Sequence, residues 1–219
     1  MAGVAVILAL MGVGLLTSVL SGLEDKIAAA KGDEILGTEG DDTLTGGDGR
    51  EFVQGLGGND VLIGNGAADL LVGGDGADLI FGGAGDDNLQ GEAGDDTLRG
   101  NDGADFLDGG AGDDKLSGFA GNDTLEGENG FDTIDGGTGD DLMRGGNNAD
   151  AMSGGAGRDV MLGGTGDDTL LGEGDDDVMQ GDAGRDLLLG GAVNDTISGY
   201  YDGTIDGVYE QRDTLDPDA

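Results

Sequence analysis

The chain has 219 residues and a formal net charge of −38, with 47 acidic and 9 basic side chains, 52 glycines and neither histidine nor cysteine. The shortage of lysine and arginine argues against nucleic acid as a partner, because phosphate binding needs clustered basic side chains. Without cysteine there are no disulfides or thiolate chemistry, and without histidine the commonest general base is missing.

The first 23 residues are the most apolar part of the chain. Residues 1–23 carry no charged side chain, and the first charges come at Glu24 and Asp25. At about 1.5 Å per residue, a helix of this length spans the roughly 30 Å hydrocarbon core of a bilayer. We therefore expect a retained transmembrane anchor helix over residues 1–23. A cleaved signal peptide is the main alternative, although it normally has a basic start and a shorter apolar core. A buried helix is a third.

Residues 24–36 form a short linker that runs into a degenerate first repeat, with Asp33 and Ile35 in phase with the later units. Eighteen nine-residue units then fill residues 37–198, about three quarters of the chain. Position one of each unit is Gly, position six is acidic and position eight is aliphatic, as in GGAGDDNLQ at 82–90. Units this small cannot bury a core alone, so they must stack. Residues 199–219 keep the phase only loosely, and we expect them to cap the end of the stack.

The period predicts how the units stack. Position-one glycine allows a tight turn, and three residues such as Asn88, Leu89 and Gln90 then make a short strand whose middle side chain points inward. Two units make one coil, so alternate units stack on opposite sides. One predicted stack contains Leu44, Leu62, Ile80 and Leu98, and the other contains Val53, Leu71, Leu89 and Leu107. The predicted fold is all-β, a right-handed parallel β-roll (β-solenoid) of about nine two-repeat coils, preceded by one transmembrane helix.

Position six carries the candidate metal ligands. They are Asp42, Glu51, Asp60, Asp69, Asp78, Asp87, Asp96, Asp105, Asp114, Asp123, Asp132, Asp141, Asp150, Asp159, Asp168, Asp177, Asp186 and Asp195. Stacking places neighbouring carboxylates about 4.8 Å apart, where two like charges repel by roughly 3.5 kcal/mol at an effective dielectric near 20. A hard divalent cation removes this repulsion. Calcium takes six to eight oxygens in flexible geometry, whereas magnesium demands a tighter octahedron.

The units resemble the RTX, or hemolysin-type, calcium-binding nonapeptide repeats. The resemblance covers residues 37–198 and implies a β-roll that calcium folds outside the cell after type I export. Two features depart from the family pattern: the apolar residues 1–23 suit membrane insertion, and the 21-residue tail 199–219 is short for a secretion segment. Both favour a membrane-tethered roll over free secretion.

Eight gaps between nine turns on each side give at most sixteen calcium ions, whose charge would nearly cancel the −38 of the chain. We expect a chain that is unfolded without calcium. Sites next to departures from the repeat should be weaker or empty. At position four these departures are Ala67, Asn148, Asp175 and Val193; the others are Leu56 and Phe119 at position two and the longer Glu51.

Two groups of outward aliphatic or aromatic side chains are predicted on one face. They are Val61, Ile63, Leu79 and Phe81 on adjacent coils, and Leu171, Leu187 and Leu189 further along. Exposed apolar clusters often mark contact surfaces, so we expect a membrane protein complex or self-association there. The plainer explanation is that such residues suit strands.

The expected function is structural or interactive, as an envelope protein or an accessory subunit of a membrane complex. The alternative is a secreted RTX surface or matrix protein. Catalysis is not expected, because paired acids such as Asp86 and Asp87 are better explained as turn and ligand residues. Ice binding is equally remote, since Thr138 and Thr165 are isolated at their position. The need for calcium places the roll in the periplasm or outside the cell, although Lys26 and Lys31 mildly favour the opposite orientation.

Overall fold

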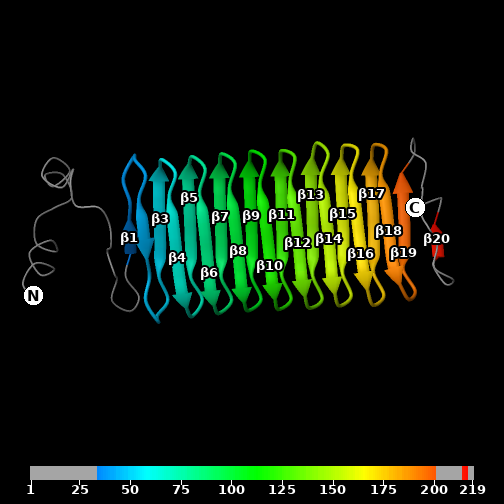
Figure 1. The fold of residues 1–219 in the computed structure, drawn as a ribbon, viewed down its shortest axis with the longest axis horizontal. Helices are drawn as coiled ribbons and strands as arrows, with labels where there is room; N and C mark the ends of the chain where they lie inside the picture. Colours follow the sequence, from blue (N-terminus) through cyan, green and yellow to red (C-terminus); the bar gives the residue numbers. More distant parts are fainter. Residues whose placement is uncertain (1–33, 201–213, 217–219) are drawn as a thin grey trace, which may run out of the picture.

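Two parallel β-sheets lie face to face and are joined along two edges by tight turns (Figure 1). The computed structural model describes residues 34–200 and 214–216. The predicted transmembrane helix over residues 1–23 lies outside the described residues, as do most of the linker and most of the tail. No helix among the described residues has the length and apolar character needed to cross a membrane.

One sheet has eleven strands and the other has nine. The eleven-stranded sheet consists, in order, of β1 (Glu34–Leu36), β3 (Phe52–Gly57), β5 (Leu70–Asp75), β7 (Asn88–Ala93), β9 (Phe106–Ala111), β11 (Thr124–Asn129), β13 (Leu142–Asn147), β15 (Val160–Thr165), β17 (Val178–Ala183), β19 (Thr196–Tyr200) and β20 (Thr214–Asp216). The nine-stranded sheet consists, in the same direction, of β2 (Thr43–Thr45), β4 (Val61–Gly66), β6 (Leu79–Ala84), β8 (Thr97–Asp102), β10 (Lys115–Ala120), β12 (Thr133–Thr138), β14 (Ala151–Ala156), β16 (Thr169–Gly174) and β18 (Leu187–Ala192).

The register confirms that two units make one coil. From β1 to β17 each strand pairs in parallel with the second strand after it, so a residue faces the residue eighteen positions later, as Leu71 faces Leu89 and Leu62 faces Ile80. The solenoid of about nine coils is therefore confirmed, whereas its right-handed sense stays a prediction.

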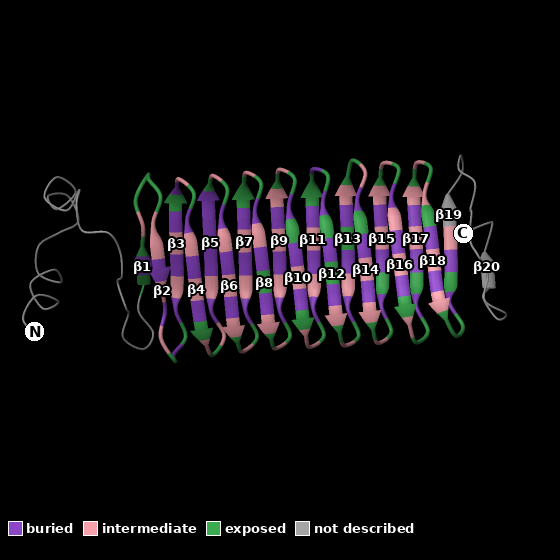
Figure 2. Ribbon diagram, in the orientation of Figure 1, coloured by how far each residue is buried: buried purple, intermediate pink, exposed green. Residues whose placement is uncertain are grey.

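The core consists of the position-eight side chains, stacked in one column on the inner face of each sheet. Leu62, Ile80 and Leu98 are fully buried in one column, and Val53, Leu71 and Leu89 are fully buried in the other. Figure 2 shows buried segments that recur from strand to strand along the solenoid. The two predicted stacks are therefore confirmed.

The predicted strand length is wrong. Each strand from β3 to β18 has six residues rather than three, and runs from position seven of one unit to position three of the next. The position-one glycine presents no side chain to the next coil, so the backbone ladder continues past it. The strand then passes through a left-handed residue at position two, such as Gly83 (φ 120°), and stays paired.

Both ends of the eleven-stranded sheet continue beyond residues 37–198. Ile35 on β1 is buried, and β1 pairs with β3, which agrees with the degenerate first repeat. At the other end β20 pairs with β19 and places Leu215 opposite Ile197, in phase with the repeat.

Candidate metal centres

Each edge of the solenoid carries one column of the position-six carboxylates. A backbone N–H in each turn donates to the inner carboxylate oxygen of the next coil: Asp60 N donates to Asp78 Oδ1 at 2.7 Å, and Asp78 N donates to Asp96 Oδ1 at 2.7 Å. The second edge repeats the pattern, for example from Asp87 N to Asp105 Oδ1 at 2.8 Å. All the predicted position-six residues lie in these columns, and all except Asp42 and Asp186 are buried.

The other oxygen of most of these carboxylates is buried without a hydrogen-bond partner. This is the state of Oδ2 in Asp60, Asp69, Asp78, Asp87, Asp96, Asp105, Asp114, Asp123, Asp132, Asp141, Asp150, Asp159, Asp168 and Asp177. A buried and unpaired charged oxygen is costly, so a repeated row of them indicates a missing positive partner.

The space beside each orphaned oxygen is left open by the position-one glycine. A Cβ on Gly64 would lie 2.5 Å from Asp69 Oδ2 and 2.5 Å from the Gly82 carbonyl oxygen of the next coil. At Gly163 the corresponding distances are 2.5 Å to Asp168 Oδ2 and 2.8 Å to the Gly181 carbonyl oxygen. The glycine therefore keeps a position free where a carboxylate oxygen and a backbone carbonyl oxygen converge.

Burial raises the pKa of most of the column carboxylates above the usual value for Asp. Desolvation is the main cause, the backbone N–H opposes it, and the charges of neighbouring acids add to it. The pKa rises to about 7 for Asp87, Asp96, Asp123, Asp150 and Asp177. It rises to about 6 for Asp60, Asp69, Asp105, Asp114, Asp159 and Asp168. The direction shows that burial disfavours the charged form of these carboxylates.

These donors fit calcium. Every group that faces the open positions is an oxygen, and the orphaned Oδ2 atoms and glycine carbonyls recur at each coil. In the described part of the chain no three acidic side chains are grouped closely enough to hold a metal ion alone. Backbone carbonyls must therefore complete each site, as calcium allows and as soft or nitrogen-seeking metals do not favour.

The first members of the columns differ from the rest. Asp42 Oδ2 accepts from Thr38 N at 2.6 Å and from Thr38 Oγ1 at 2.8 Å within its own turn. Glu51 Oε2 accepts from Gly47 N at 3.1 Å. These carboxylates are already hydrogen bonded at the oxygen that has no partner in Asp60 and most later members, so the first sites have less free oxygen to offer.

The departures from the glycine pattern keep the turn geometry. Ala67 (φ 69°), Asn148 (φ 78°) and Asp175 (φ 69°) are left-handed at position four, and Leu56 (φ 85°) and Phe119 (φ 74°) are left-handed at position two. The prediction of weaker sites beside them stays a prediction.

A second, outer ladder at position five was not anticipated. Ala104 N donates to Asp86 Oδ1 at 3.0 Å, and Asp113 N donates to Asp95 Oδ1 at 3.0 Å, so each carboxylate here accepts from the following coil. The inner carboxylates accept from the preceding coil instead. The recurrence of Asp or Asn at position five could have predicted this ladder. In the sequence alone, however, an acidic residue beside the position-six ligand looks like a solvated turn residue.

Arginine joins this outer ladder at two places. Arg158 pairs with Asp140 at 2.6 Å, and Arg185 pairs with Asp167 at 2.7 Å, each across one coil. Hydrogen bonds from the backbone N–H and then the guanidinium of Arg158 hold the pKa of Asp140 below its usual range, and the guanidinium and backbone N–H of Arg185 do the same for Asp167. The outer row therefore pairs with a side-chain cation at these two places.

The comparison with protein families agrees with this geometry. The model of the RTX calcium-binding nonapeptide repeat matches in overlapping copies from residue 28 to residue 197. No curated protein matches the chain at a significant level. Because the family model covers most of the chain, and the matched units are the coils that form the carboxylate columns, this protein belongs to the RTX calcium-binding nonapeptide-repeat family.

Proposed function

We propose that this protein is a calcium-folded β-roll, tethered to a membrane through residues 1–23, that serves as a structural or interaction module of an envelope or membrane complex. The observation that carries the calcium part is the repeated buried Oδ2 atom without a partner, beside a carbonyl oxygen and an open position. The tether is supported by the uncharged, apolar composition of residues 1–23.

The residues that would hold calcium are the position-six acids together with carbonyl oxygens of the glycine turns. Bound calcium would supply positive charge beside the buried Oδ2 atoms that have no hydrogen-bond partner among the described residues. The ladder gives eight gaps on each edge, so we propose up to sixteen ions. Fewer are expected at the Asp42 end, where Thr38 already occupies the carboxylate.

Calcium removal tests the first part. Circular dichroism of the full chain should show β-structure in millimolar calcium and lose it in excess chelator, and magnesium at the same concentration should not restore it. Calorimetric titration should give a stoichiometry well above one and at most sixteen. A β-sheet spectrum that persists after chelation would refute the proposal.

Protease protection tests the tether and its orientation. Cells are converted to spheroplasts, and protease is added in calcium and then in chelator. Full-length protein in the membrane pellet that is cut from outside only after chelation supports an anchored external roll. Proteins with these repeats are typically secreted or extracellular, so an external location suits the family.

A secreted surface or matrix protein is the second candidate, since the same family location supports it. Protein recovered from the medium without its first residues would select this candidate and exclude the anchor. In either setting we propose a role without catalysis, because the acids of the columns are accounted for as ligands and turn residues.

A further inference from the structure

The outward face of the nine-stranded sheet carries one apolar cluster near each end, as the sequence predicts. The first cluster lies on β4 and β6 and consists of Val61, Ile63, Leu79 and Phe81. The second cluster lies on β16 and β18 and consists of Leu171, Leu187 and Leu189. All these side chains keep partial exposure, so the face has apolar surface to bury at both ends.

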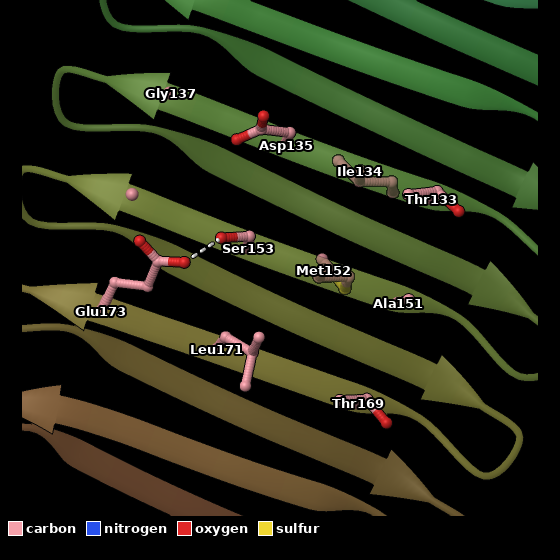
Figure 3. A pocket seen from close by; sticks show the side chains of 11 residues that line it. Thr133, Ile134, Asp135, Gly137, Ala151, Met152, Ser153, Thr169, Leu171 and Glu173 are labelled. Carbon is pink, nitrogen blue, oxygen red and sulfur yellow. Dashed lines mark hydrogen bonds between the residues drawn. The ribbon is translucent and has the colours of Figure 1, made fainter.

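Between the clusters the face changes from basic to acidic. Arg99 on β8 lies over the ring of Phe81, 5.5 Å from its centroid, so its guanidinium rests on the sheet. A shallow groove follows on β12, β14 and β16, with Ser153 in the middle and Asp135 and Glu173 on either side (Figure 3). Ser153 Oγ donates to Glu173 Oε1 at 2.9 Å, and no basic side chain lines the groove.

We propose that this face is the interface of a two-fold symmetric dimer of the chain. The two-fold axis runs parallel to the strands and passes between β10 and β12. It places β4 of one copy over β18 of the other, β6 over β16, and β8 over β14. Closed two-fold dimers are the commonest soluble assemblies, and they need a face that is complementary to itself.

The two apolar clusters are complementary to each other under this axis. An axis parallel to the strands keeps the strand direction, so equivalent positions of the repeat face each other. Position seven brings Val61 over Leu187, and position nine brings Ile63 over Leu189 and Phe81 over Leu171. Each cluster therefore covers the other, and the contact occurs twice.

The charged side chains of this face are also complementary to one another under the two-fold axis. The same operation brings Arg99 of one copy over Ser153 of the other, where Asp135 and Glu173 lack a cation. Desolvation, and then the charge of Glu173, raises the pKa of Asp135, so a cation from the second copy would be favourable there. An axis along the solenoid would instead place each strand over its own copy, so Arg99 on β8 would lie over β8 of the partner, three strands away from Ser153 on β14. Charge complementarity therefore selects the axis that runs parallel to the strands.

The opposite face does not offer this match. On the eleven-stranded sheet Asp108 lies next to Glu126 in the register, and the charges of Glu128, Glu126 and Glu92 add to desolvation in raising its pKa. Two copies of that face would bring acids together near its centre. The second copy is therefore expected on the nine-stranded face.

The area is sufficient for a stable dimer. The eight strands from β4 to β18 are spaced about 4.8 Å apart, and six residues extend about 20 Å, so the face measures roughly 34 Å by 20 Å. That corresponds to roughly 700 Å² per partner, or about 1,400 Å² in total, which lies within the standard range for specific interfaces.

The first test is sedimentation of the full chain in calcium and a non-ionic detergent, after circular dichroism has shown that each variant is folded. Wild type is expected to dimerise, and Arg99→Glu should raise the dimer dissociation constant at least tenfold. The double variant Arg99→Glu with Glu173→Arg restores opposite charges and should recover the dimer. Arg144→Glu makes the same charge change on the other sheet and serves as the control.

The second test fixes the geometry, using the absence of native cysteine. A spin label at Ser117→Cys beside the axis should lie about 5 Å along the roll from its partner, with about 10 Å between the sheets. A label at Thr45→Cys on β2 should be about 43 Å away along the roll, nine strand spacings.

Four outcomes overturn the dimer while calcium folding stands. The first is a folded chain that stays monomeric, and the second is a dimer that Arg99→Glu leaves intact. The third is a short distance at both spin labels. The fourth is a monomer whose spin label at Ser117→Cys contacts lipid, which would assign the face to a membrane. A chain that does not fold in calcium fails the proposed function instead, and circular dichroism tells the two failures apart.

Discussion

The interior columns and the edge columns of this solenoid are buried to nearly the same degree but have opposite chemistry. Leu89 and Leu98 are 0% exposed, and Asp87 and Asp96, two positions earlier, are 3% and 1% exposed. Burying an aliphatic side chain is favourable without a partner, whereas burying a carboxylate is costly without a counter-charge. The same short repeat therefore builds a centre whose burial is favourable without a partner and edges whose burial depends on a cation, so folding is expected to depend on that cation.

The largest effect is expected from protonation, which neutralises the carboxylates of the edge columns without any metal. In eleven column carboxylates the pKa rises to about 6 or 7, above the unfolded value near 3.9, so the folded state binds more protons. The free energy of unfolding of the calcium-free chain should therefore rise as the pH falls through about 7. This gain should reach its full value below about 3.9. Circular dichroism of resin-stripped protein from pH 8 to pH 5 should show β-structure returning. A flat signal would show that protonation cannot replace calcium.

A change in the interior column should act at any calcium concentration. Leu98→Ala removes a fully buried side chain and leaves a cavity, so it should cost about 2–5 kcal/mol in denaturant unfolding. The neighbouring outward variant Thr97→Ala is the control and should cost about 0.5 kcal/mol or less. If the loss at Leu98 disappeared in high calcium, the two columns would not be independent.

A change in the edge column should act through calcium instead. Asp96→Asn keeps the shape and removes one buried charge, so folding should need several-fold more calcium, while the calcium-free chain should be no less stable at neutral pH. Asp95→Asn alters the exposed outer ladder and is the matched control. Equal effects of the two variants on the calcium midpoint would remove the distinction between the inner and outer ladders.

The smallest effect concerns a strained turn. Val193 has φ 104°, in a region that β-branched residues avoid and glycine tolerates. Val193→Gly should therefore stabilise the last coils by about 1 kcal/mol in thermal or denaturant unfolding. Val193→Ala keeps a Cβ in the same conformation and should recover much less. A destabilised glycine variant would show that the valine side chain has a contact role.

The parts of the molecule that repeat strictly were predictable. An acidic residue at the position of Asp87 and an aliphatic residue at the position of Leu89 recur in every unit. The period alone places the first in an edge column and the second in an interior column. The outer ladder was missed because Asp86 belongs to a position where Ala, Asn and Arg also occur, so its phase is diluted. The six-residue strands were missed because their second half depends on pairing with neighbouring coils, which residue preference at glycine-rich positions does not reveal.

The register of eighteen residues has a consequence for how this molecule can change in length. Duplication of two consecutive units would lengthen the rod by one strand spacing, about 4.8 Å, and leave every downstream side chain on its own face. Duplication of a single unit would move Leu171 and Leu189 from one face of the rod to the other, because odd and even units build different sheets. Recombination within the repeats is therefore expected to add or remove units in pairs, so that the length of the rod changes while each face keeps its side chains.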